Sequence, residues 1–322
     1  MIKTNKFFRN LAVILVAISA TSCIQKIFSD ELIKDSDLPK GILPTNEMTY
    51  GNAKDEKYAE HAVKFTFTRS DNFSYSSIEL LGDGTFLLLE YPSKAGYDGY
   101  IAGGYTVEAK GRYSLEDFGT LQIEENGDSY NLVFDNLNGN RISTVYAVKE
   151  QAQTDNATKS LCRTWQIQTT EEWMYLGSSL LINTKYHGGD EPYFEGVVGV
   201  DDEEMQYNID AMCKTMRFTP YGTYYCTYNN GTERISTWKW GDAEKGILFF
   251  DWEYGEQDEG YVTVRFAGSQ LRTYEDYIFN LEDYIEEESD DEESQAYIDV
   301  LSAFTGDKHL RYLIVNTMTS NN

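Results

Sequence analysis

The chain has few basic residues for its length of 322. Lysine and arginine together number 27, against 53 aspartate and glutamate residues, and the formal net charge is −26. A charge of this sign keeps a protein soluble and repels phosphate backbones and anionic headgroups. We therefore predict that nucleic acid is not a partner.

Motifs that carry chemistry are missing as well. The three histidines, His61, His187 and His309, lie far apart in the sequence and have no motif context. There is no Gly-x-Ser-x-Gly elbow for a nucleophile and no Gly-Lys-Ser/Thr loop for a phosphate. We predict no catalytic residue, no cofactor and no metal. The acids Asp190, Glu191 and 201–204 are interpreted as a solvated loop, and a carboxylate-pair hydrolase stays open as a third class of function.

Cysteine is scarce, and no CxxC pair suggests a metal site. The four cysteines are Cys23, Cys162, Cys213 and Cys226. Cys213 and Cys226 flank a predicted turn at Thr219–Gly222, which places Cys213 opposite Tyr228. We expect mostly buried free thiols, with a bridge only if a bulge shifts the register.

No apolar run is long enough to span a bilayer. The run from Leu11 to Ala20 is shorter than the roughly 20 residues that a membrane helix needs. It follows a basic start (Lys3, Lys6, Arg9) and ends in small residues, which is typical of a secretory signal. The sequence predicts a signal peptide over residues 1–22.

Cys23 follows the small residues directly, and this leader resembles that of a Bacteroidetes-type bacterial lipoprotein. Ala20 departs from the pattern, because many such signals have Leu there. The resemblance implies an acylated Cys23 that anchors an outer-membrane lipoprotein in the cell envelope, on either the periplasmic or the surface face. Several acyl chains hold a protein firmly, since each buried CH₂ contributes about 0.8 kcal/mol. The alternative is an ordinary secretory signal with a chance cysteine.

Aromatic residues, by contrast, are abundant, with 25 Tyr, 16 Phe and 5 Trp. Such residues suit pleated, half-buried surfaces. From Val63 onward, short alternating segments are separated by turns such as Gly82-Asp83-Gly84, and this pattern predicts antiparallel strands. That turn lacks the further acidic ligands of a calcium loop. We predict a long loop over 92–104.

These patterns predict an all-β, mainly antiparallel chain with two tandem β-barrel domains. A tether is expected over 23–60, an N-terminal β domain over 61–150 and a C-terminal β domain over 158–318. Tyr277, Ile278 and Leu281 follow helical spacing, which predicts an acidic helical insert over 276–305 before a last strand.

Short motifs recur between the two halves and suggest an internal repeat. Gly84-Thr85-Phe86 matches Gly222-Thr223-Tyr224, and Gly119-Thr120-Leu121 matches Gly246-Ile247-Leu248. The second pair lies six residues after Tyr113 and Trp240 respectively.

The second half opens with Leu161 and Trp165. With the turns above, these residues resemble the lipocalin-like domains of bacterial lipoproteins, although Arg163 stands where that family usually has Gly. The resemblance implies a small closed barrel, with Trp165 at one end and room for a pocket.

The main functional hypothesis is a lipid-anchored, non-enzymatic envelope protein. It would bind a small apolar ligand or an envelope partner through the C-terminal domain. The alternative is a surface glycan-binding lipoprotein of a carbohydrate-uptake system. Trp238, Trp240 and Trp252 are the candidate ligand contacts. Alternation places Trp238 and Trp240 on one face of a strand, which a hydrophobic core also requires.

Overall fold

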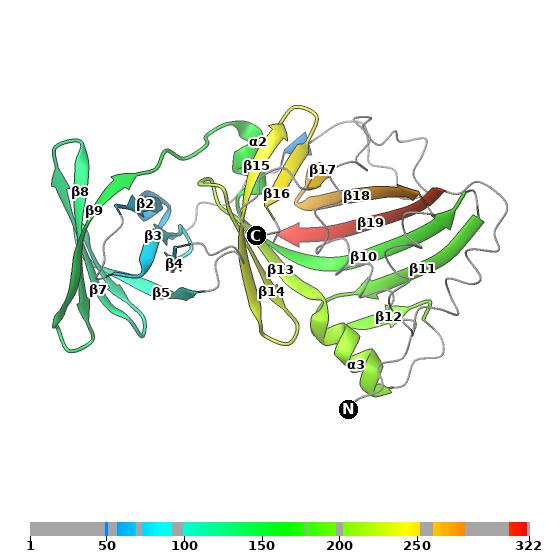
Figure 1. Cartoon of the computed structure of the whole chain (residues 1–322), viewed down its shortest axis with the longest axis horizontal. Coiled ribbons are helices and arrows are strands. Elements are labelled where there is room, and N and C mark those ends of the chain that lie inside the picture. The colour runs from blue at the N-terminus through cyan, green and yellow to red at the C-terminus, as the bar shows by residue number, and fades with distance from the viewer. Residues whose placement is uncertain are drawn as a thin grey trace. The chain divides into compact units, whose positions relative to one another are not determined.

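A computed structural model describes residues 49–50, 57–68, 73–91, 99–177, 179–197, 202–251, 260–280 and 309–320 (Figure 1). The described residues form two compact units. The N-terminal unit comprises 53–159 together with 219–223, and the C-terminal unit comprises 160–218 and most of the chain from 224 onward. The predicted signal peptide, Cys23 and Trp252 lie outside the described residues.

The N-terminal unit is a closed barrel of consecutive antiparallel strands, β2 to β9, and β9 pairs back with β2. The strands are β2 (Val63–Phe67), β3 (Tyr75–Leu80), β4 (Thr85–Glu90), β5 (Tyr100–Ala109), β6 (Arg112–Leu115), β7 (Gly119–Asn126), β8 (Ser129–Asn136) and β9 (Arg141–Lys149). Alternate side chains of β2 point inward and join a core rich in Phe and Tyr. An eight-stranded barrel has an interior that side chains can fill, and here aromatic rings occupy it.

One turn of this barrel is packed against Tyr58, which precedes the short 3₁₀ helix η3 (Ala59–His61). The backbone N–H of Tyr58 donates to Gly82 O at 2.7 Å, and its ring lies 5.2 Å from the ring of Tyr105. Gly84 has φ +95°, and a Cβ added there would lie 2.7 Å from the Tyr58 ring. The glycine therefore provides both the backbone conformation and the space for the ring.

Replacing Gly84 with alanine is expected to lower the free energy of unfolding of the N-terminal unit by about 1–3 kcal/mol, because strain and a clash combine. Gly127→Ala is the matched control, since Gly127 has φ +64° but no atom within 4 Å of an added Cβ. Urea unfolding followed by circular dichroism would compare the two variants. Equal losses would show that Tyr58 does not contribute.

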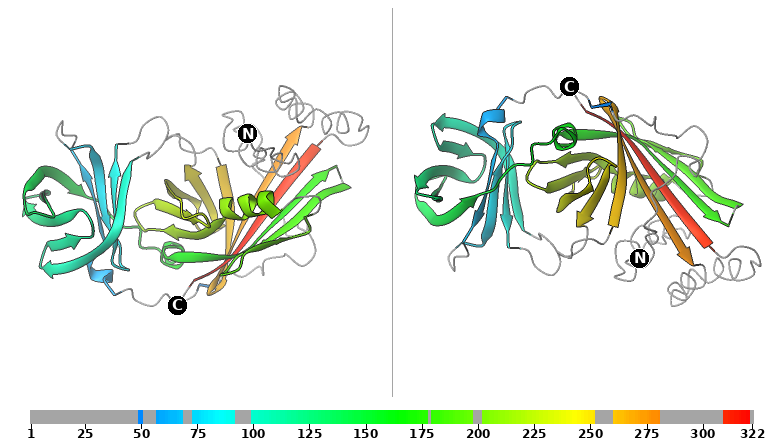
Figure 2. Two further views of the ribbon diagram at one scale, coloured as in Figure 1. Left: turned by 90° about the horizontal axis from the view of Figure 1, so that it is seen from below. Right: turned by 90° about the horizontal axis from the view of Figure 1, so that it is seen from above.

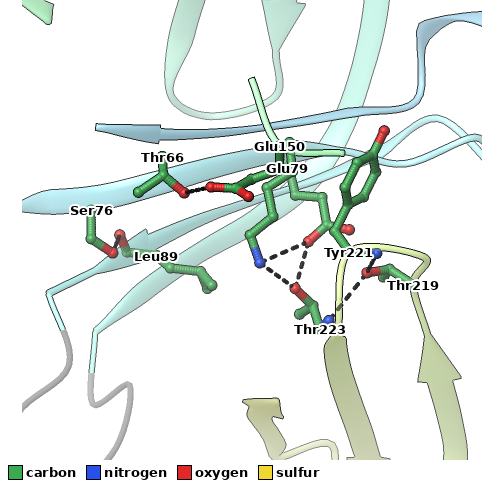
Figure 3. A network of polar contacts seen from close by, with 9 residues as sticks. Thr66, Ser76, Glu79, Leu89, Glu150, Thr219, Tyr221 and Thr223 are labelled. Atoms are coloured by element: carbon green, nitrogen blue, oxygen red, sulfur yellow. Dashed lines mark hydrogen bonds and ion pairs between the residues drawn. The ribbon is translucent and has the colours of Figure 1, made fainter. Parts of the chain in front are cut away.

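The turn 219–223 belongs to the N-terminal unit through a small buried network on the outer face of β2 and β3 (Figure 3). Thr223 Oγ1 donates to Glu79 Oε2 at 2.6 Å, and Lys64 Nζ lies 2.8 Å from Thr223 Oγ1 and 3.7 Å from Glu79 Oε2. Only 1% of Glu79 is exposed. Within the described part of the chain, Lys64 is the basic residue that pairs with the buried carboxylate of Glu79.

The C-terminal unit contains a second ring of antiparallel strands, in which β10 pairs with both β13 and β19 and so closes the ring. The ring consists of β10 (Thr164–Leu176), β13 (Cys213–Phe218), β14 (Thr223–Tyr228), β15 (Glu233–Asp242), β16 (Ile247–Asp251), β17 (Gly260–Gly268), β18 (Gln270–Asn280) and β19 (His309–Ser320). A parallel two-residue strand, β1 (Thr49–Tyr50), pairs with β17.

β10 is long enough for one of its edges to pair with two different strands in turn. Its first residues pair with β13, whereas its second half pairs with β11 (Ser179–His187), which in turn pairs with the short edge strand β12 (Tyr193–Glu195). β19 lies on the other side of β10 throughout, and both views in Figure 2 show β18 and β19 side by side. The described residues contain two α-helices: α2 (Asn156–Leu161), which includes the boundary between the units at 159–160, and α3 (Asp202–Ala211) in the C-terminal unit.

The predicted fold class, mainly antiparallel β with two barrels, is confirmed. Three local predictions are wrong. Residues 202–204 were expected in a solvated loop but form the start of α3. Residues 100–104 were expected in a loop but begin β5, where they pair with β4. Residues 276–280 were expected in a helical insert but end β18, where they pair with β19. The rest of that insert, 281–305, lies outside the described residues.

One pair of the matched motifs occupies the same strand position in the two barrels, and another pair does not. Gly84 and Gly222 both precede the third strand of their ring, β4 and β14. Gly119 is the first residue of β7, the sixth strand of the first ring. Gly246, by contrast, lies just before β16, the fifth strand of the second ring. The later motifs are therefore offset by one strand, and only the Gly-Thr-aromatic hairpins occupy equivalent positions.

Candidate functional site

The two faces of the C-terminal barrel wall are assigned by the ladder β10–β19–β18. Trp165 and Ile167 of β10 point inward and belong to the main core of the unit. A bulge between Ile167 and Thr169 then shifts the register, so that the inward positions become 170, 172, 174 and 176. Trp173 points the other way, into a separate cluster with Leu313 and Val315.

At one end of the interior, the inner face is apolar. Trp165 is fully buried and its Nε1–H donates to Leu161 O at 2.8 Å. Trp238 is buried in the same cluster, with its ring 5.9 Å from Phe218, and Trp240 packs against it at 5.7 Å. Trp238 is thus part of the core, and Trp240 is partly buried beside it.

The next inner-face row is polar and crosses three strands. Thr170, Asn316 and Thr273 stand side by side on β10, β19 and β18. Thr170 Oγ1 donates to Asn316 Oδ1 at 2.7 Å, and Asn316 Nδ2 donates to Thr273 Oγ1 at 3.1 Å. All three are buried. We call these residues the amide row.

Glu172 lies one row beyond the amide row and is only 3% exposed. Thr184 Oγ1 donates to its Oε2 at 3.4 Å, and the Tyr312 side chain lies near the carboxyl group. Glu275 follows on the same inner row, across β19. Burial raises the pKa of Glu172 to about 7, although Tyr312 and Thr184 oppose the rise, and the negative charge of Glu275 adds to it.

A carboxyl group with this pKa exchanges a proton near neutral pH. It can accept a hydrogen bond as the carboxylate or donate one as the acid. With the amide row beside it, the inner face offers donors and acceptors directly next to an apolar wall. This combination of an apolar lining and a few polar groups is typical of small-molecule sites.

Replacing Glu172 with glutamine is expected to stabilise the protein above neutral pH. The unfolded carboxyl has its ordinary pKa of 4.5 and the folded one has a pKa of about 7. The native state therefore binds the proton more tightly, and stability falls as pH rises from 4.5 through 7, by about 3 kcal/mol in all. Glu172→Gln removes this loss, so the gain grows with pH.

Urea unfolding between about pH 5.5 and 8.5 would measure this difference. Glu171→Gln is the control, because the neighbouring Glu171 faces outward and pairs with Lys185 at 3.2 Å. That variant should keep the slope of the wild type, because it retains Glu172. A parallel course for wild type and Glu172→Gln would contradict the raised pKa.

The histidines and the acidic residues noted in the sequence do not come together in one site within the part of the chain that the structure describes. His61 Nδ1 lies 3.4 Å from Tyr113 Oη in the N-terminal unit, and His187 stacks on Tyr193 with 4.5 Å between ring centroids. His309 is exposed at the start of β19. Asp190 and Glu191 are exposed in a bend. No group of three metal-ligating side chains occurs in the described ranges.

Two predictions, one about a turn and one about strand register, are confirmed. Asp83 Oδ1 accepts hydrogen bonds from both the N–H and the hydroxyl of Thr85, as expected for a turn. Cys213 faces Tyr228 across β13 and β14, and Cys162, Cys213 and Cys226 are free thiols. Of these, Cys226 is buried and the other two are half-buried.

Glu172 and the amide row were missed by sequence reasoning. The pair Glu171-Glu172 offers no sign of which carboxylate points inward. The alternation that starts at Trp165 would place Glu171 inside, and only the bulge at Gln168 reverses this. The signal that could have pointed to the site is a run of Thr and Glu within a strand that begins with buried Trp165 and Ile167.

No protein-family model matches the chain, and no curated protein matches it. A solved structure with a weak likeness is a protein of unknown function from the DUF3598 family of Nostoc punctiforme. It is 10% identical, with 80% of this chain and 93% of that chain covered, and the TM-score is 0.16. A likeness at this level carries no argument about fold or function. Within the described part of the chain, no helix has the length and apolar character to cross a bilayer.

Proposed function

We propose that this protein is a lipid-anchored, non-enzymatic protein of the cell envelope whose C-terminal barrel binds a small molecule on its inner face. The ligand is mostly apolar and carries one hydrogen-bonding group. The observation that supports this is the polar inner face of β10, β18 and β19. There, the amide row and Glu172 adjoin the apolar cluster around Trp165.

The chemistry of the two parts fits such a ligand. Apolar wall residues supply affinity through burial, while a few fixed polar groups supply orientation. Glu172 suits a ligand group that donates a hydrogen bond, and Asn316 suits either a donor or an acceptor.

The test begins with the full chain purified from membranes in mild detergent, followed by mass spectrometry of the small molecules that co-purify. The expected result is one apolar compound in near-stoichiometric amount. The double variant Thr170→Val with Asn316→Leu replaces two of the three polar side chains of the amide row by apolar ones of similar shape and should lose that compound. Thr169→Val is the control on the outward side of β10. Equal recovery from both variants, or no bound compound in wild type, would overturn the binding proposal.

The anchor is tested separately. Cys23→Ser removes the sulfur that acylation requires, so the protein should move from the membrane fraction to the soluble fraction. Unchanged partition between the fractions would contradict lipid anchoring at Cys23 without affecting the inner-face proposal.

A glycan ligand is the second candidate, and one exposed aromatic pair favours it. Tyr193 on the edge strand β12 is 52% exposed and stacks on His187, whose Nε2 lies 3.0 Å from Glu195 Oε2. A ring held flat in this way can stack against a sugar face. Binding on a glycan array that is lost in Tyr193→Ala, with no small molecule co-purifying, would favour this candidate over the first.

A further inference from the structure

Two cysteines lie on the inner face of the hairpin β13–β14, and both pack in the main cluster of the unit. Cys213 Sγ donates to the carbonyl oxygen of Thr215 at 3.2 Å and to that of Thr227, the chain neighbour of Cys226, at 3.7 Å. Cys226 Sγ lies 2.6 Å from Tyr224 Oη. The two cysteines therefore share one cluster, and the Cys213 side chain reaches across to the backbone beside Cys226.

The register of the β13–β14 ladder explains why Cys213 and Cys226 lie on the same face. Cys213 pairs with Tyr228 and Met216 pairs with Cys226, with a register shift between Cys213 and Thr215. In a regular ladder, residues one row apart on the same face are diagonal neighbours about 7–8 Å apart, which is longer than most disulfides allow. A bulge bends and twists its strand, so the register shift beside Cys213 can bring this diagonal pair closer than a regular ladder does.

We propose that Cys213 and Cys226 form a reversible intramolecular disulfide, and that this pair is the site at which the chain reacts with small-molecule disulfides. The inference is independent of the ligand on the barrel's inner face. It singles out one pair among the three described cysteines, because Cys213 and Cys226 face the same way on paired strands whereas Cys162 lies outside that ladder.

The order of reaction follows from exposure. Cys213 is half-buried and Cys226 is buried, so Cys213 meets the oxidant first. Its thiolate attacks the disulfide RSSR, forming Cys213–S–S–R and releasing one RS⁻. The Cys226 thiolate then attacks the Cys213 sulfur and releases the second RS⁻. The two cysteines lose two electrons, RSSR becomes two RSH, and the two thiol protons end on those two products.

The surroundings make the exchange slow at neutral pH. The interaction with Cys226 is the main cause that raises the pKa of Cys213 well above its ordinary value, and burial is the second. Little thiolate is therefore present. The reaction should therefore speed up as pH rises. This distinguishes the pair from a low-pKa redox sensor.

The experiment treats the native full chain with oxidised glutathione at mildly alkaline pH and then maps tryptic peptides without reduction. Trypsin cleaves after Lys185, Lys214, Arg217 and Arg234, so the two cysteines fall in separate peptides, 186–214 and 218–234. The expected product is these two peptides joined, with a loss of about 2 Da for the two hydrogens removed. Dithiothreitol should separate them again.

Variants make the test specific. Cys226→Ser should retain glutathione on Cys213 as a stable mixed disulfide, because no second thiol can displace it. Cys162→Ser should form the linked pair as wild type does. If native wild type keeps glutathione on Cys213, links Cys162 instead, or shows no link after prolonged oxidation, the proposal fails. Circular dichroism of each variant verifies that the reaction is that of a folded chain.

Discussion

Replacing Trp165 with alanine is expected to lower the free energy of unfolding of the C-terminal barrel by about 3–5 kcal/mol. The side chain is fully buried in the main cluster, and its ring lies 6.4 Å from that of Phe266. Alanine would leave a cavity and would also orphan Leu161 O, which accepts the Trp165 Nε1–H at 2.8 Å.

Trp165→Phe separates the two contributions, because phenylalanine fills most of the space but makes no hydrogen bond to Leu161. We expect it to lose less than half as much as alanine. Tyr207→Ala serves as the surface control, since Tyr207 is 62% exposed and should change stability by about 0.5 kcal/mol or less. Urea unfolding monitored by circular dichroism measures all three. A small loss for Trp165→Ala would show that this ring does not support the end of the barrel.

Replacing Lys64 with methionine is expected to lower the stability of the N-terminal unit by about 3–5 kcal/mol. Methionine retains the aliphatic stem but removes the charge beside Glu79, and that carboxylate is buried under the turn 219–223. Glu79 Oε1 already has no hydrogen-bond partner in the described part of the chain, so the remaining contact would be Thr223 Oγ1 at 2.6 Å. A buried charge left without a counterion is much more costly than a lost surface pair.

The double variant Lys64→Met with Glu79→Gln provides the decisive comparison. It removes both charges and should recover most of the lost stability, whereas the single Lys64→Met variant should not. Lys110→Met is the matched control, because Lys110 is exposed. If single and double variants unfold at the same urea concentration, the ion pair is not what stabilises this turn.

The parts of the fold that followed from the sequence are those with local causes. Glycines at turns and alternation within strands located the hairpin at Gly84 and the pairing of Cys213 with Tyr228. The helical spacing around Tyr277 was misleading, because the strand is fixed by β19, which begins about thirty residues later. Propensity and spacing are weak where a distant partner decides the structure.

The candidate site depends on the same kind of non-local information. Whether Glu171 or Glu172 lies inside is decided by a single bulge in the ladder with β19. A shift of one residue exchanges the two faces of a strand. The chain's own pattern therefore could not distinguish the outward carboxylate, which pairs with Lys185, from the inward one, which has a raised pKa.

The ring of the C-terminal barrel is closed unevenly. β10 is joined to β19 at eleven register positions, from Trp165 to Leu176, but to β13 at only three, from Thr164 to Gln166. The short ladder is the seam of the cylinder, because few backbone hydrogen bonds need to break there. Under load or partial denaturation the barrel should unzip there first and persist as a curled sheet, with β10, β18 and β19 still joined.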